Sequence, residues 1–514
     1  MSAKAVSKGI VSVGGWSVAK LATSALVLPL LARLLGIEGY GQYAYYVAVL
    51  LLASQFANVG MMQTMTKLVA ERPDDLPWCR AVAKAGALIN GLGVMTVGLI
   101  VGLFIWNHAP QGTPAMSIAV VVVAVLLLDQ MWFYARGILY GLRHEERAAV
   151  PGIIGVVMAG ILGVAFAMNG MGVMGVFMGL LVSNLFVALV CLRKVIRALD
   201  DATCDQPVCV MPLPIRGMLQ FGGSALVFSV LNMALCSLDV ILVRHLAGEA
   251  QAGLYAAAVQ WSQFVWFIPI AVEGVMLQAT ARLWAEQQVN DVTKLVSRLM
   301  RYVVLGIVFL LLLVTILGDK IVLLYFGPQF MEAAVGLRLL VPGAFCYALA
   351  RVMWPVIQAG GDGTHLVRVL GVTVLVDVGL CWTLIPIWGA AGAAMATSVS
   401  FALVAVGYAW VLRRRQIRLF EGFAVSRLVV LILGAAVAVA GGAALVSTPI
   451  LSIVIGGLAG TIVYWGGVFW LGLLQVDEVE QLVQSLPGTL RHIGEKALCY
   501  VEPVLLRLKT VALH

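Results

Sequence analysis

The sequence predicts an all-α, polytopic membrane protein that crosses the bilayer about fourteen times. Its 514 residues are 62% hydrophobic and only 11% charged, and the mean hydropathy is +1.00. This composition excludes an ordinary soluble domain. Apolar stretches of roughly 20 residues, each long enough to cross the hydrocarbon core, recur along the chain. We expect spans at 9–34, 41–69, 81–106, 115–140, 149–168, 173–192, 218–246, 252–281, 298–317, 336–358, 366–387, 390–412, 424–446 and 449–474.

The basic residues predict the orientation of these spans, because lysine and arginine are retained on the cytoplasmic side. They gather in alternate loops, whereas the loops near 107–114, 168–172, 388–390 and 447–449 contain none. Both termini are therefore predicted to be cytoplasmic. The formal net charge of +8 is dispersed among the basic loops, which argues against nucleic-acid binding.

An internal duplication predicts how the spans are organised. Ser7–Gly15 returns as Ile215–Gly223, and Arg33–Ala44 returns as Arg244–Ala256. Six predicted helices separate the two copies. Because six is an even number, both halves enter from the same side and form a parallel repeat about the membrane normal. A duplicated membrane half is typical of a two-lobed transporter that exposes its substrate alternately on either side.

The predicted domains follow from this duplication. We expect an N-lobe over 1–197 and a C-lobe over 217–415, each with six helices, joined by a cytoplasmic linker at 198–216. Helices 13 and 14, within 416–474, fall outside the duplication and are interpreted as an accessory unit or part of a lipid-facing groove. Residues 475–514 have the pattern of a cytoplasmic amphipathic tail.

The sequence indicates no metal site and no cofactor. The closest of the eight cysteines, Cys204 and Cys209, lie on the predicted cytoplasmic linker, where thiols stay reduced, and no further cysteine or histidine joins them. Nothing resembles a phosphate-binding P-loop, which argues against ATP hydrolysis.

Three motifs carry a resemblance to a known family. They are Leu34–Ala44, the turn Tyr325–Phe330 with the following Ala333 and Ala334, and Leu384–Ala394. In their order and spacing the chain resembles the polysaccharide-export flippases of the multidrug/oligosaccharidyl-lipid/polysaccharide exporter superfamily. The resemblance implies a multi-pass protein of the bacterial inner membrane. It would flip polyprenyl-diphosphate-linked oligosaccharide repeats by alternating access, for O-antigen of lipopolysaccharide or for exopolysaccharide. We expect membrane lipids around the protein, a polysaccharide polymerase as a partner, and no catalytic residues.

Polar side chains within the predicted spans are candidates for the substrate cavity. Lys20 lies near the middle of the first span, where an unpaired charge is costly, so it is expected to face the interior and attract a diphosphate; a structural ion pair is the alternative. Arg351 suits phosphate geometry, although it is also placed to snorkel. Neutral amides that suit sugar hydroxyls, or hydrogen bonds between helices, are Gln55, Asn58, Asn232 and Gln263.

Three intramembrane carboxylates are candidates for coupling to a proton or sodium gradient. Asp239, on the seventh helix, is the strongest, although pairing with Arg244 or Arg33 is an equal alternative. Asp129 shares a helix face with Arg136, which favours structural pairing of each with another helix. Asp377 is a similar isolated acid on the eleventh helix.

Other functions remain open at this stage. A peptidoglycan-precursor flippase or a drug/cation antiporter of the same superfamily is the main alternative, although Lys20 would repel cationic drugs. A membrane glycan polymerase is a third reading. Such an enzyme ordinarily needs a substantial exterior loop, and the longest visible loop, around 318–335, is short.

Overall fold

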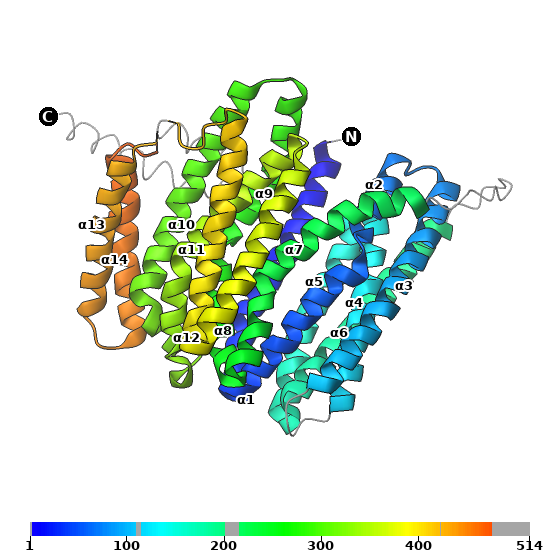
Figure 1. Ribbon diagram of the computed structural model, residues 1–514, viewed down its shortest axis with the longest axis horizontal. Helices are drawn as coiled ribbons and strands as arrows, with labels where there is room; N and C mark the ends of the chain where they lie inside the picture. The colour runs from blue at the N-terminus through cyan, green and yellow to red at the C-terminus, as the bar shows by residue number, and fades with distance from the viewer. Residues whose placement is uncertain (1–2, 109–114, 201–214, 422, 475–514) are drawn as a thin grey trace. The chain divides into compact units, whose positions relative to one another are not determined.

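The computed structural model describes residues 3–108, 115–200, 215–421 and 423–474 (Figure 1). Within these ranges the chain forms helices and contains no β-strand, so the all-α prediction is confirmed. Most of the predicted loop near 107–114, most of the linker and the tail from 475 lie outside the described residues, as do Cys204 and Cys209.

The helices of the first half end at residue 200. They are α1 (Ala3–Asn58), α2 (Met61–Glu71), α3 (Leu76–His108), α4 (Ala115–Gly141), α5 (Glu145–Phe166), the short π-helical η1 (Ala167–Met171) and α6 (Gly172–Asp200). The later helices are α7 (Ile215–Ala247), α8 (Glu249–Val265), α9 (Phe267–Ala285), α10 (Val289–Tyr325), the 3₁₀ turn η2 (Pro328–Phe330), α11 (Ala333–Ala359), α12 (Gly363–Arg414), α13 (Val425–Ala444) and α14 (Pro449–Trp470).

Among the described residues, ten helical segments are long and apolar enough to cross a membrane, so the protein is a multi-pass membrane protein. Three of these segments, at 18–58, 145–199 and 363–414, are long enough to cover two predicted spans each. All three change direction at a glycine with positive φ. These glycines are Gly36 (φ 70°) within α1, Gly170 (φ 83°) within η1 and Gly389 (φ 54°) within α12. Glycine adopts this conformation without the steric cost that a Cβ would add.

Two predicted spans are broken rather than continuous. The span expected over 41–69 is interrupted between α1 and α2, where Val59 and Gly60 have φ values of 49° and 68°. The span expected over 252–281 is interrupted at Trp266, between α8 and α9. The predicted exterior loop at 318–335 is largely helical, because α10 continues to Tyr325 and η2 follows.

The chain divides into two compact units. Unit 1 consists of 1–260, 326–336 and 363–403, and unit 2 consists of 261–325, 337–362 and 404–514. These units are defined by contacts in space, whereas the two six-helix lobes were inferred from the sequence duplication. The lobes therefore stay a prediction.

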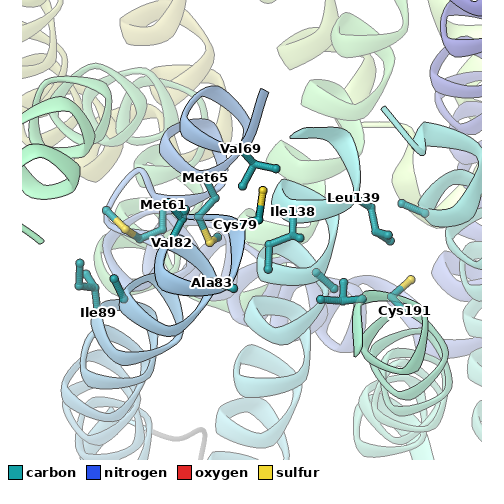
Figure 2. Close-up of a cluster of buried hydrophobic side chains, with 14 of the residues drawn as sticks. Met61, Met65, Val69, Cys79, Val82, Ala83, Ile89, Ile138, Leu139 and Cys191 are labelled. Carbon is teal, nitrogen blue, oxygen red and sulfur yellow. The ribbon is translucent and has the colours of Figure 1, made fainter. Parts of the chain in front are cut away.

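Apolar side chains form the core of each unit. In unit 1, one cluster joins α2, α3, α4 and α6; its labelled members in Figure 2 include Met65, Cys79, Ile138 and Cys191. In unit 2, Tyr464 of α14 is fully buried against Phe309 of α10 and donates a hydrogen bond to the Leu305 carbonyl (2.7 Å). An apolar groove of about 410 Å³ lies between α13 and α14.

Candidate functional site

A pocket of about 320 Å³ lies within unit 1, among α1, α4, α5 and α6. We call it the Lys20 pocket. It places Lys20 of α1 and Asp129 of α4 on one lining, together with the aromatic rings of Trp16, Tyr43 and Trp132. The polar side chains that complete the lining are Thr23, Ser24, Ser54, Ser183 and Asn184. The structure therefore joins two candidate residues that lie far apart in the sequence.

The two cations near this pocket have different surroundings. The Arg136 guanidinium carbon lies 4.8 Å from the centre of the Trp16 ring, 5.3 Å from Trp132 and 4.9 Å from Tyr140. The Lys20 Nζ lies 5.6 Å from the Trp16 ring, and the Lys20 side chain is exposed in the pocket. Within the part of the chain that the structure describes, neither cation forms a direct ion pair with Asp129. Arg136 is thus held by cation–π contacts, whereas the Lys20 ammonium is accessible to a ligand.

A hydrogen-bond network continues from Asp129 into the protein. The Ser54 hydroxyl donates to Asp129 Oδ2 (3.3 Å), and the Gln130 amide donates to the Ser54 hydroxyl (2.7 Å). Asn58 Nδ2 donates in turn to Gln130 Oε1 (3.3 Å). Gln130 is fully buried, so its polar atoms need these partners. Asn58 belongs to this network and is absent from the pocket lining.

The network ends at the break between α1 and α2. Asn58 Oδ1 accepts the backbone N–H of Met62 (3.2 Å) and so caps the start of α2. At the break, the Gly60 backbone is so close to α7 that a side chain there would collide with the carbonyl oxygen of Gly222. An interrupted membrane helix is tolerated where neighbouring groups bind the freed backbone, and such helices often border transport sites.

A second polar group in unit 1 combines Asp239 of α7 with Asp377 and Cys381 of α12. We call these three residues the acidic cluster. Their candidate ligand atoms lie within 4.8 Å of one another, and all three residues are buried. Tyr255 and Thr397 both donate to Asp239 Oδ2, at 2.8 and 2.7 Å. Among the described residues, Asp377 Oδ1 has no hydrogen-bond partner.

The acidic cluster has the chemistry to hold a small cation or a shared proton. Two buried carboxylates repel each other in a medium of low dielectric constant unless positive charge lies between them. Oxygen donors suit hard cations. Arg244 does not supply the charge, because it pairs instead with Glu249 (3.5 Å). Sequence reasoning named both aspartates separately but missed Cys381, Tyr255 and Thr397, which only the packing of α7, α8 and α12 brings together.

The remaining candidates lie elsewhere. Arg351 forms an ion pair with Glu273 (2.7 Å) and lies 5.1 Å from the Trp354 ring, all within unit 2. Gln55 is half-buried on α1 and does not line the Lys20 pocket; Asn232 is half-buried on α7. The Gln263 side chain lies outside the described residues.

The two duplicated turns contact each other within unit 1, which the sequence did not indicate. The Gln42 amide donates to Glu249 Oε2 (2.5 Å), and a side chain on Gly41 would collide with the Glu249 carbonyl oxygen. Arg244 donates to the His108 carbonyl (3.0 Å) and lies 4.1 Å from the Tyr45 ring. The sequence did contain one signal for this contact, because Gln42 and Glu249 both belong to the repeated elements.

A comparison with known protein families identifies the family to which the chain belongs. Residues 7–268 match the family of polysaccharide biosynthesis proteins. The chain therefore belongs to that family. No curated protein matches the chain.

Solved structures show the same fold. The lipid II flippase MurJ in an inward closed conformation is 13% identical, with 91% of this chain and 99% of that chain covered and a TM-score of 0.66. An inward-facing multidrug resistance MATE family transporter of the superfamily is 15% identical, with 80% and 96% covered and a TM-score of 0.61. A superfamily transporter from Pyrococcus furiosus, described as having a binding pocket of reverse polarity, is 14% identical, with 79% and 95% covered and a TM-score of 0.57.

Proposed function

We propose that this protein flips polyprenyl-diphosphate-linked oligosaccharide repeat units across the bacterial inner membrane, with both termini in the cytoplasm. The observation that carries the proposal is the Lys20 pocket: an accessible cation lies beside aromatic and hydroxyl-bearing side chains inside a membrane-spanning unit. The family assignment supports the polysaccharide pathway. The flipped repeat units would be used for O-antigen or exopolysaccharide, and a polysaccharide polymerase would be the partner that receives them.

The substrate poses a physical problem that such a pocket addresses. A polyprenyl tail is stable in lipid, but each glycan hydroxyl costs roughly 2–7 kcal/mol if it loses water without gaining a partner. Thr23, Ser24 and Asn184 line the pocket and form no side-chain hydrogen bond among the described residues. Their polar atoms would replace water around the sugars while the tail stays in lipid.

Lys20 would bind the diphosphate. Its exposed ammonium is a point charge with three donors, and a diphosphate supplies the acceptors. Asp129 lines the same pocket and would repel an anion. The opposite charges of Lys20 and Asp129 would therefore favour one orientation of the head group.

The acidic cluster would couple transport to a gradient of protons or sodium ions. One charge that crosses 100 mV releases about 2.3 kcal/mol, which would give the flipping step its direction. Asp239 and Asp377 would bind the cation, with the hydroxyls of Tyr255 and Thr397 holding Asp239 in place.

Deletion of the gene tests the proposed function. Lipid-linked intermediates would be extracted and identified by mass spectrometry, and their leaflet assigned with a membrane-impermeant reagent. We expect a complete repeat unit to accumulate on the inner leaflet. Unchanged glycans together with a new drug sensitivity would favour the antiporter and contradict the proposal.

The likeness to the lipid II flippase supports a second candidate function, export of a peptidoglycan precursor. The same extract distinguishes the two functions. Accumulation of the peptidoglycan precursor, with unchanged polysaccharide intermediates, would replace the first proposal by the second.

A further inference from the structure

A second polar cavity, of about 990 Å³, lies within unit 2 and has no part in the proposed transport site. It is bounded by the beginning of α10, the end of α12 and the segment that follows α12. We call it the Arg413 cavity. Its lining consists of Asn290, Thr293, Lys294, Ala409, Arg413, Gln416, Ile417, Arg418, Leu419, Phe420 and Glu421.

The Arg413 cavity has an excess of positive charge that its own acids do not neutralise. Lys294 pairs with Asp291 (3.3 Å), and Arg418 pairs with Glu421 (3.5 Å). Arg413 is exposed on the lining and has no ion pair within the described ranges. The excess charge of the cavity is therefore that of Arg413.

The arginines next to Arg413 are already engaged. The guanidinium carbon of Arg414 lies 3.8 Å from the Trp410 ring, and Arg415 pairs with Asp362 (2.7 Å). Positive charge at the end of a membrane helix is ordinary. What distinguishes Arg413 is that it lines a cavity while its neighbours have partners outside it.

The wall that carries these cations is a structured turn. The backbone N–H of Ile417 donates to the Leu412 carbonyl (3.1 Å). Gln416 adopts a φ of 60°, which is uncommon for a residue other than glycine. Ile417 is buried, and the Ser297 hydroxyl donates to the Arg418 carbonyl (2.6 Å). Helix α10 thus holds the turn in a defined position beside the cavity.

Aromatic residues place this region at the level of the lipid head groups. Trp410 is 49% exposed and Phe420 is 43% exposed, although both are large and apolar. Trp and other aromatic side chains at the end of a membrane helix commonly lie at the membrane–water interface. The run of arginines at 413–418 assigns this end to the cytoplasmic side, where the head groups are those of the inner leaflet.

We propose that the Arg413 cavity binds the head group of an anionic phospholipid of the inner leaflet. Arg413 would bind the phosphate, because its planar guanidinium offers paired donors to two oxygens. Asn290, Thr293 and Gln416 would bind the hydroxyls of a glycerol head group. Basic pockets between membrane helices on the cytoplasmic side are suited to such lipids. A zwitterionic lipid carries its own positive charge and would not neutralise the excess positive charge of the cavity.

Native mass spectrometry of the full-length purified protein, titrated with dioleoyl phosphatidylglycerol, tests the proposal. We expect Arg413→Gln to weaken the tightest lipid binding at least fivefold. Arg298→Gln is the matched control, because Arg298 is an exposed arginine on the same α10 but lies outside the cavity lining. It should change binding less than twofold, and phosphatidylcholine should bind all three proteins equally weakly.

Equal loss in both variants would overturn the proposal, because it would show only a general effect of surface charge. Displacement of phosphatidylglycerol from Arg413 by farnesyl diphosphate, at comparable concentration, would assign the cavity to the transported lipid and also overturn it. Failure of inorganic pyrophosphate to displace the lipid would support it. If Arg413→Gln does not fold, Arg413→Lys keeps the charge without the paired donors, and an intermediate loss of binding is expected.

Discussion

The Lys20 pocket and the acidic cluster are both polar sites in unit 1, yet they are built in opposite ways. The pocket is open, and its accessible charge is a cation beside aromatic rings. The cluster is closed, its charges are carboxylates, and buried hydroxyls bind Asp239. An open cationic pocket suits a large anionic ligand, whereas a closed acidic one suits a small cation. The two sites therefore separate the proposed binding of substrate from the proposed coupling to an ion.

The largest expected effect comes from the accessible cation. Lys20→Ala removes the only charge that we assign to the diphosphate, so we expect at least a tenfold loss of polysaccharide export at normal protein level. Lys84→Ala, which changes an exposed lysine on α3 outside the pocket, should retain full export. Quantification of surface polysaccharide in a complemented deletion strain measures both. Full export by Lys20→Ala would remove the diphosphate role.

The next effect concerns the acidic cluster. Asp239→Asn and Asp377→Asn each remove a carboxylate, so transport should lose its dependence on an imposed ion gradient while slow gradient-independent flipping remains. Ser237→Ala, a change at a buried residue on the same helix α7, serves as the control. Initial rates in proteoliposomes with and without the gradient measure the effect. Unchanged gradient dependence in both aspartate variants would exclude coupling at this cluster.

A smaller effect is expected at the helix break behind the Lys20 pocket. Gly60→Ala places a Cβ against the Gly222 carbonyl and imposes a left-handed conformation on alanine. The cost should be about 1–3 kcal/mol, visible as a lower thermal unfolding midpoint. Gly91→Ala has open space around the new Cβ and should leave the midpoint unchanged or higher. Equal midpoints for both variants would mean that the break relaxes freely.

The smallest effect on substrate binding is expected from Asn58. Its amide binds Gln130 and the start of α2 and does not line the pocket. Asn58→Ala should therefore lower the free energy of unfolding by about 1–3 kcal/mol, the cost of leaving the buried amide oxygen of Gln130 without its donor. The apparent affinity for the lipid-linked substrate should stay within twofold. A larger loss of affinity, measured by substrate titration in nanodiscs, would move Asn58 into the binding site.

Much of the fold could be predicted from the sequence, because long apolar stretches in lipid must form their backbone hydrogen bonds within a helix. The helix breaks at Val59–Gly60 and at Trp266 could not be predicted, since hydropathy averages over residues and carries no information about φ. Asn58-Val59-Gly60 contained a signal, because an asparagine can cap the helix that follows a glycine.

The candidate sites were predictable as residue types but not as groupings. Lys20, Asp129, Asp239 and Asp377 stood out because a charge within an apolar span is costly. Which of these residues lie close together depends on the packing of distant helices. The duplication did not indicate these groupings, since the two halves differ at these positions. The cation–π contact between Arg136 and Trp16 was missed for the same reason, because Trp16 lies on a different helix.

Flipping by the purified protein in liposomes tests the central proposal most directly. The substrate would be a fluorescent polyprenyl-diphosphate-linked oligosaccharide, and a membrane-impermeant quencher would report its leaflet. We predict translocation by the wild-type protein and by Lys84→Ala, and none above the protein-free rate by Lys20→Ala. Absence of translocation by the wild-type protein under an ion gradient, or equal rates for wild type and Lys20→Ala, would contradict the account.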